Sequence, residues 1–268
     1  MMDDGLQLFA LKQIPLVEPG DRLDEIIVDA LDKSGLTLQQ GDLIVLAQKI
    51  VSKSENRYCD LVSVSVSEEA KALAKKVTKD PRLVELILRE SKQVIRAVPG
   101  VLIVEHSLGL IHANAGIDHS NISNGYGKDG DRSFEGDTRV LLLPVNPDRS
   151  AAELRKQLKE KTGVNIGVMI NDSVGRAWRK GTTGLAIGVA GVEPLRDLCG
   201  EPDLFGQQLQ ATELGYADEL ASAASLLMGQ AGEGRPIVLI RGASLGDPEG
   251  QNSGAGVLQR EAERDLFR

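Results

Sequence analysis

The chain has 268 residues, with 31 Lys and Arg against 39 Asp and Glu, so its formal net charge at pH 7 is −8. An acidic chain argues against nucleic acid or an anionic membrane as the main partner. Any anionic ligand must therefore bind where positively charged side chains are concentrated locally. The length is sufficient for a substantial core, in one large domain or two moderate ones.

The sequence carries no membrane or export signal. No apolar run approaches eighteen residues, and the first residues lack the basic-then-apolar order of a signal peptide. We therefore expect a soluble, cytoplasmic protein. Cys59 and Cys199 lie far apart and share no zinc-site spacing with the three histidines, so we expect buried free thiols.

Short strands and one helix are predicted in the first 66 residues. A strand at residues 6–11 leads to Pro15, which ends regular structure. Apolar residues recur at helical spacing over 23–31, and the continuous apolar run 43–47 indicates a buried strand. Alternating Val and Ser at 62–66 predict a half-exposed strand.

Two helices and three strands are predicted between residues 67 and 113. Ser67 followed by two acids marks one helix start, and Asp80 before Pro81 marks another. The strands are expected at 94–98, 101–104 and 110–113.

Residues 123–137 are rich in Gly, Asp, Asn and Ser, which predicts a long mobile loop. Its position beside chemically active residues leaves a substrate lid open as an alternative to simple disorder. A strand at 141–143 follows, and Ser150 with Glu153 forms a capping-box pattern for a helix ending near Gly163.

The remaining residues are predicted to form strands at 164–170 and 236–240 and an apolar helix at 217–228. Gly184 and Gly188, in the apolar run 183–190, allow another backbone to approach closely. The glycine-rich residues 229–234 join the helix to the last strand. From about residue 243 we expect a loose tail before a short charged helix. The elements together predict a mixed α/β or α+β architecture.

Two aspartates carry the main chemical signal. Residues 170–181 form a glycine-punctuated loop that combines Asp172 and Ser173 with three cations, Arg176, Arg179 and Lys180. Asp118 likewise follows an apolar strand. If the strands are neighbours, Asp118 and Asp172 can share a hard cation such as Mg²⁺ or Mn²⁺. The alternative is that each aspartate caps a turn.

Lys49 and Lys53 directly follow the buried strand 43–47 and suggest a phosphate-binding surface, with a solvated strand end as the alternative. Gly-x-x-x-x-Gly-Lys-Ser/Thr, Gly-x-Ser-x-Gly and His-Glu-x-x-His motifs are all missing. Nucleophilic catalysis by serine or cysteine therefore has little support. Metal-assisted phosphoryl or acyl-phosphate chemistry fits the residues better.

Four motifs occur in order along the chain. They are Ala-Gln-Lys-Ile-Val-Ser-Lys at 47–53, Asn-Ala-Gly-Ile-Asp-His-Ser-Asn at 114–121, Asp-Ser-Val-Gly-Arg-Ala-Trp-Arg-Lys-Gly at 172–181 and Ala-Ile-Gly-Val-Ala-Gly at 186–191. Together they resemble the coenzyme F420-0:γ-glutamyl ligase family, over about residues 6–242. The resemblance implies a single ligase-like domain across 1–268, with an unusual α/β fold that forms an intertwined homodimer.

The resemblance also implies an activity. Members of this family are GTP-dependent amide ligases that add L-glutamate to the lactyl carboxylate of coenzyme F420-0 and then to the growing γ-linked tail. The proposed route activates the acceptor carboxylate as an acyl phosphate. The implied cofactors are one or two Mg²⁺ or Mn²⁺ ions, with K⁺ as a further cation and GTP as co-substrate.

Site residues follow from the same resemblance. Asp118, Asp172 and Ser173 match metal ligands. The nucleotide-contacting positions are matched by Ile14, Pro15, Leu16, Val17, Gln48, Lys53 and Asn121, and by a further loop made of Met228, Gly229, Gln230, Ala231, Gly232, Glu233, Gly234 and Arg235. The catalytic set is Asp118, Asp172 and Lys53, with Arg176 and Arg179 added from their charge and position.

Two departures from the family pattern lie at the expected metal site. Ser173 stands where threonine is common, which keeps a hydroxyl ligand. Gln230 stands where some members carry an acid, so a second metal would be held more weakly or differently. Two alternatives remain open, namely a related nucleotide-dependent ligase acting on a different acid, and a non-catalytic nucleotide-binding module.

Overall fold

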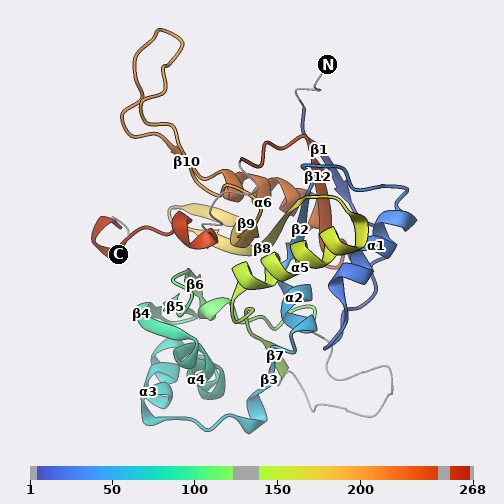
Figure 1. The fold of residues 1–268 in the computed structure, drawn as a ribbon. Helices are drawn as coiled ribbons and strands as arrows, with labels where there is room; N and C mark the ends of the chain where they lie inside the picture. Colours follow the sequence, from blue (N-terminus) through green and yellow to red (C-terminus); the bar gives the residue numbers. More distant parts are fainter. Residues whose placement is uncertain (1–4, 123–138, 247–253, 266–268) are drawn as a thin grey trace.

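The computed structural model describes residues 5–122, 139–246 and 254–265. The loop predicted at 123–137 lies outside the described residues. The described chain has the mixed α/β architecture that the sequence predicts (Figure 1). Within these three ranges, no helix is both long and apolar enough to cross a membrane.

A five-stranded sheet forms the centre of the fold. Its order is β1 (Gln7–Ala10), β12 (Ile237–Arg241), β2 (Leu43–Ala47), β8 (Gly167–Arg176) and β9 (Arg179–Ala190). Strands β2 and β8 are parallel, and the other neighbouring pairs are antiparallel. Residues 43–46 and 237–240 are completely buried because helices cover both faces of the sheet, which explains their continuous apolar runs.

Three helices cover one face of this sheet, and one covers the other (Figure 1). The first face carries α1 (Leu23–Lys33), α2 (Gln48–Ser54) and α5 (Pro147–Thr162). The opposite face carries α6 (Tyr216–Met228), which brings a row of buried alanines against the strands. The chain therefore builds two apolar layers on one sheet.

Two glycines of β9 permit close packing, as the sequence predicts. A Cβ atom at position 184 would overlap the carbonyl oxygen of Ala221 in α6, and one at position 188 would overlap Pro147 at the start of α5. Helices therefore approach β9 closely from both sides.

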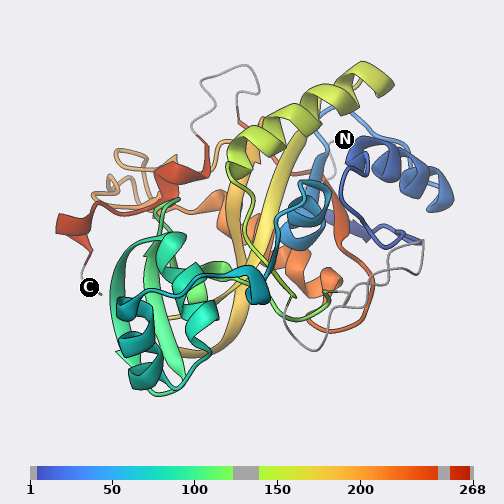
Figure 2. The same ribbon diagram turned by 90° about the horizontal axis from the view of Figure 1, so that it is seen from below.

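A smaller unit packs beside one end of the central sheet (Figure 2). It consists of α3 (Glu68–Val77) and α4 (Pro81–Arg89) on a three-stranded sheet of β4 (Ser91–Val98), β5 (Val101–His106) and β6 (Ile111–Ala113). Both predicted helix starts are confirmed, since Ser67 accepts a hydrogen bond from the amide of Ala70 and Asp80 accepts one from Arg82. Short strands β3 (Tyr58–Asp60) and β7 (Arg139–Leu141) pair next to this unit.

A long arm projects from the body between β10 (Arg196–Asp197) and β11 (Glu213–Leu214) (Figure 1). The remaining short elements are the 3₁₀ helices at Leu61–Ser63, Asn114–Gly116, Ala255–Leu258 and Ala262–Arg264. The tail from about residue 243 contains buried Leu245 and Ala255, both packed in the layer under α6. Residues 247–253 of that tail lie outside the described chain.

The prediction of a loop at 170–181 is wrong. Strand β8 continues to Arg176, Ala177 and Trp178 form the turn, and β9 begins at Arg179. Asp172 and Ser173 pair with Leu185 and Gly184 in β9. Backbone hydrogen bonds between β8 and β9 keep these polar residues extended, although their sequence lacks the apolar alternation that would predict a strand. Trp178 has a φ of 63° and is 87% exposed, so it anchors no core.

The strand predicted at 62–66 is also wrong. Leu61–Ser63 is a 3₁₀ helix, because the carboxylate of Asp60 accepts a hydrogen bond from the amide of Val62 and caps the turn. Val62 is 68% exposed in this turn and Val64 after it is buried, so the valines of the alternating run do not share one face of a strand.

The capping box at Ser150 and the burial of both thiols are further errors. Helix α5 begins at Pro147, and Asn146 caps it by accepting a hydrogen bond from the amide of Arg149. Ser150 thus lies inside the helix, where its hydroxyl donates to the carbonyl of Asn146. Cys59 is partly buried, whereas Cys199 is exposed on the projecting arm.

Candidate active site

A cavity of about 1360 Å³ opens at the end of strand β2 and beside residues 171–173 in the middle of β8. Segments far apart in the sequence form its walls, including residues 14–19, the start of α2, residues 118–122 and the connection between α6 and β12. A single small ligand typically occupies roughly 300–1,000 Å³. The cavity therefore has room for more than one substrate.

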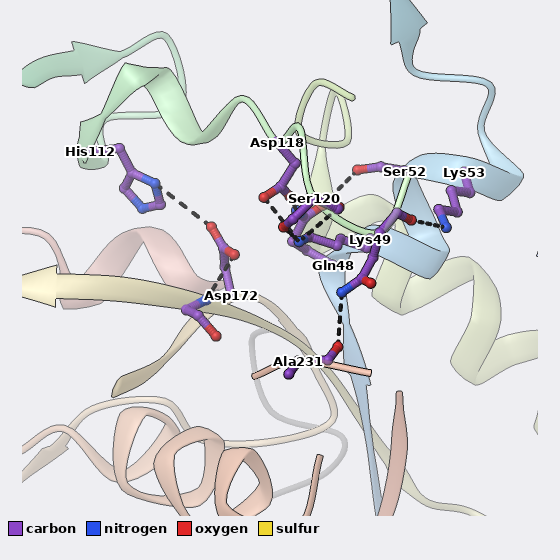
Figure 3. Close-up of polar contacts among 11 residues, drawn as sticks. Gln48, Lys49, Ser52, Lys53, His112, Asp118, Ser120, Asp172 and Ala231 are labelled. Atoms are coloured by element: carbon purple, nitrogen blue, oxygen red, sulfur yellow. Dashed lines mark hydrogen bonds and ion pairs between the residues drawn. The ribbon is translucent and has the colours of Figure 1, made fainter. Parts of the chain in front are cut away.

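Asp118 lies on one wall of this cavity and is held in place from both sides. Its backbone exchanges two hydrogen bonds with Leu141, of 2.9 and 3.0 Å. The side-chain amide of Gln48 donates to Oδ2, and Lys49 Nζ lies 3.1 Å from Oδ1 (Figure 3). Burial raises the pKa of Asp118, while the nearby ammonium of Lys49 opposes that rise.

The amide of Gln48 is itself oriented. Ser52 Oγ donates to Gln48 Oε1 at 2.8 Å, one helical turn further along α2. With Oε1 occupied in this way, the amide nitrogen of Gln48 faces the Asp118 carboxylate. The first two turns of α2 therefore position Asp118 as well as shaping the cavity.

Asp172 extends from β8 toward the same space. Burial, followed by the negative charge of Asp118, raises the pKa of Asp172 to about 7. Oδ1 accepts a hydrogen bond of 2.7 Å from the amide of Ser173. Both aspartates line one cavity, although the strands expected to be neighbours, β6 and β8, belong to different sheets. A cation shared by the two aspartates stays a prediction.

His112 of β6 is the buried neighbour of Asp172. Its Nδ1 lies 3.7 Å from Asp172 Oδ2, and the residue is 4% exposed. Burial and the charge of His106 lower the pKa of His112 to about 4, so the imidazole is neutral at pH 7. A neutral imidazole does not balance the charge of the carboxylate beside it.

The two partly buried carboxylates form a donor set that suits a hard divalent cation. Two like charges in one low-dielectric space destabilise each other, and a cation between them would remove that cost. Within the described ranges, no three or more His, Cys, Asp or Glu residues are grouped to hold a metal. The remaining ligands would be hydroxyl, water or phosphate oxygens, which is the usual environment of Mg²⁺.

A second set of contacts ties the cavity walls together. Lys53 Nζ donates to the carbonyl of Asn121 at 2.7 Å, and Asn121 Nδ2 donates to the carbonyl of Ala231 at 2.9 Å. The carboxylate of Glu233 accepts a hydrogen bond of 2.8 Å from the amide of Ala231. Helix α2, the segment after Asp118 and the loop after α6 thus form one connected wall.

The structure brings most of the predicted site residues together. Asp118, Asp172, Ser173, Lys53, Gln48 and Asn121 line the cavity, as do Ile14, Pro15, Leu16 and Val17 and every residue from Met228 to Arg235. Arg176 and Arg179 do not line it. They are exposed at the end of the β8–β9 hairpin, where Arg176 donates to the carbonyl of Lys180 at 3.3 Å.

Sequence reasoning missed four residues near this site. Tyr58, Arg139 and Ser225 line the cavity, and His112 contacts Asp172. None belongs to the set that the motifs assign. Of these four, only Arg139 carried a local signal, as a cation two residues before the strand predicted at 141–143. The other three are brought to the cavity by pairing between distant segments.

Known proteins with similar sequences identify the family. The profile of F420-0:Gamma-glutamyl ligase matches residues 12–242. The coenzyme F420:L-glutamate ligase of Methanopyrus kandleri is 41% identical to this chain, covering 98% of it and 99% of the relative. The ligase of the same name from Methanothermobacter thermautotrophicus is 42% identical, covering 98% of this chain and 99% of the relative. The one from Methanococcus maripaludis strain C7 is 43% identical, covering 96% of this chain and 95% of the relative.

The matched region contains all four motifs and every cavity residue from the nucleotide-contacting and metal-ligand sets. The resemblance found in the sequence is thereby confirmed. The chain belongs to the F420-0:γ-glutamyl ligase family.

Proposed function

We propose that this protein is a GTP-dependent ligase that joins L-glutamate to the lactyl carboxylate of coenzyme F420-0 and then extends the γ-linked tail. The observation that carries the proposal is the single cavity, which gathers both aspartates and every proposed nucleotide-contacting residue. Its volume suits a nucleotide together with an acceptor. The names of the relatives support F420 and glutamate as substrates.

The chemistry requires activation of a carboxylate. The acceptor carboxylate oxygen attacks the γ-phosphorus of GTP, the bond to the bridging oxygen breaks, and GDP leaves. The acyl phosphate formed then accepts the amine of glutamate at its carbonyl carbon. Phosphate leaves, the amine loses a proton, and an amide results. Each step moves negative charge among phosphoryl oxygens, so nearby cations stabilise it.

The chain's own residues fit these needs. Lys49 and Lys53 place two ammonium groups along the wall that carries Asp118. Asp118 and Asp172, with Ser173, would hold one or two Mg²⁺ or Mn²⁺ ions, which would supply charge neutralisation at the phosphates when bound. K⁺ remains a further proposed cation. Roles for Arg176 and Arg179 remain predictions, because their side chains lie outside the cavity.

We also propose a homodimer, in which the projecting arm contributes to the contact between copies. Leu204 and Phe205 at the arm are 99% and 89% exposed. Two adjacent apolar side chains this exposed on a projecting arm suit contact with a second copy of the chain. The net charge of −8 agrees with small-molecule substrates rather than nucleic acid or membrane as partners, and a cytoplasmic location remains a prediction.

The proposal is tested by incubating the protein with F420-0, glutamate, GTP and Mg²⁺ or Mn²⁺, followed by mass spectrometry. We expect F420-0 to gain glutamyl units together with release of phosphate. No such gain, with phosphate release on another acid, would favour a related ligase. Tight GTP binding without phosphate release under any acceptor would favour a non-catalytic binding module.

A further inference from the structure

The cationic wall of the cavity contains two residues that have no role in the reaction described above, Arg139 and Tyr58. Arg139 and Tyr58 line the cavity close to Lys53. Arg139 is the first residue of β7 and Tyr58 the first of β3. The pairing of these strands puts Tyr58 opposite Leu141, next to the backbone contact that holds Asp118.

Stacking fixes the direction of the Arg139 side chain. Its guanidinium carbon lies 3.6 Å from the centre of the Tyr58 ring. An arginine stacked on an aromatic ring presents its flat face to the ring, while its N–H groups lie in the guanidinium plane and point outward from its edge. Such a preordered fork suits the paired oxygens of a phosphate group.

Several cations line this wall. Lys49 Nζ lies 3.1 Å from Asp118 Oδ1, and Lys53 Nζ donates to the carbonyl of Asn121 at 2.7 Å. Lys53, Arg139 and both aspartates line the same cavity.

Lys53 also shows that this part of the wall is rich in positive charge. Burial lowers the pKa of Lys53, and the charges of Lys49 and Arg139 lower it further. Burial and neighbouring cations disfavour the charged form of an ammonium group. An anion that binds beside the group stabilises that charged form. A polyphosphate would supply several such negative charges.

We infer that Arg139, held by Tyr58, forms with Lys53 a phosphate subsite for the polyphosphate of a nucleoside triphosphate. This inference rests on the proposed function for the identity of the nucleotide. A triphosphate bound in this cavity can then contact Arg139 and Lys53 at the same time. Arg139 is a binding residue in this arrangement.

Isothermal titration of the full chain in the presence of Mg²⁺ tests the inference, with tripolyphosphate and GTP as separate ligands. We expect Arg139→Ala to weaken both about tenfold, which corresponds to about 1.4 kcal/mol. Tyr58→Leu removes the stacking and is expected to weaken both less. Tyr58→Phe keeps the ring and should bind as the parent does.

Arg149→Ala serves as the matched control, because Arg149 lies on the outer face of α5 with its side chain 70% exposed. It should leave both dissociation constants unchanged. If Arg139→Ala does not fold, as judged by circular dichroism, Arg139→Gln replaces it with the same expectation. Unchanged binding of tripolyphosphate and GTP in a folded Arg139 variant overturns the inference. A rise in the KM of the phospho-acid acceptor in that variant does not alter this conclusion.

The titration contains neither acceptor nor glutamate, so it is independent of the ligase reaction. A protein that makes no glutamyl product but loses tripolyphosphate affinity on Arg139→Ala would disprove the proposed function and retain the subsite. A protein that makes the product while its Arg139 variants bind both ligands normally would retain the function and disprove the subsite.

Discussion

His112 and Asp172 belong to different sheets, yet their side chains meet at the candidate active site with 3.7 Å between Nδ1 and Oδ2 (Figure 3). His112 comes from β6 of the smaller unit, and Asp172 comes from β8 of the central sheet. Gly116 lies against the imidazole, and a Cβ at that position would be 3.1 Å from His112 Nδ1. The smaller unit therefore places a buried imidazole beside Asp172 at the edge of the cavity.

Replacement of Asp172 by Ala or Asn is expected to abolish ligase turnover while the fold remains. The carboxylate is a proposed cation ligand and contributes little core volume. Loss of at least about a hundredfold in kcat is expected for a charge-stabilising group. Mn²⁺ should raise the Tm of the parent but not of either variant, as differential scanning fluorimetry would measure. Asp29→Asn, on the exposed side of α1, is the matched control. Near-normal activity would remove Asp172 from the mechanism.

Replacement of His112 should weaken metal binding through Asp172. Removing a group that orients a metal ligand typically costs about 10–100-fold in metal affinity. We expect His112→Leu to show a loss in that range for Mn²⁺, measured by electron paramagnetic resonance. His112→Asn keeps a polar nitrogen near the position of Nδ1 and should bind more tightly than His112→Leu. His112→Gln places its amide near the position of Nε2 and should not restore binding. Equal Mn²⁺ affinity in all three variants would argue against orientation of Asp172 by His112.

The carboxylate of Glu85 should make the stability of the protein depend on acid pH. It accepts hydrogen bonds from the amide and hydroxyl of Ser67, at 2.9 and 2.6 Å, and from Arg89. The contacts to Ser67 are the main reason that the pKa of Glu85 is lowered from 4.5 to about 2. The folded state thus binds fewer protons than the unfolded state between these values. This stabilisation is complete above about pH 4.5 and is lost as the pH falls toward 2.

We therefore expect Glu85→Gln to lower the free energy of unfolding by about 2 kcal/mol at pH 7, as is typical for hydrogen bonds to a charged group. The difference from the parent should shrink as the pH approaches 2, measured by urea unfolding across the acid range. Glu160→Gln, whose side chain is 65% exposed, should show little difference at any pH. A Glu85→Gln effect that stays constant with pH would mean that the charge is not responsible.

The exposed apolar residues of the arm should support dimer formation. Replacing both Leu204 and Phe205 by Asp puts two charges where an apolar contact is expected, and desolvating them is costly. We expect the mass in sedimentation equilibrium to shift from dimer toward monomer, with the circular dichroism spectrum unchanged. Val62→Asp changes another exposed apolar residue, 68% exposed, and should leave the mass unaltered. A dimer that survives the double substitution would exclude the arm as its main contact.

Several local features of this protein were correctly predicted from the sequence alone. The apolar runs at 43–47 and 237–240 indicated buried strands, because a strand covered on both faces needs no polar alternation. Ser67 and Asp80 indicated helix starts, since their side chains bond to amides a few residues away. The order of the motifs indicated the family. Each of these signals depends on residues that are close together in the chain.

Only the tertiary structure decided how the cavity is built. Cross-strand bonds to β9 turned the expected loop around Asp172 into a hairpin, and the turn directed Arg176 and Arg179 to the outside. The stacking of Arg139 on Tyr58 and the contact of His112 with Asp172 each join segments tens of residues apart. Such contacts depend on strand pairing and on packing between units, which are properties of the whole chain rather than of any short stretch.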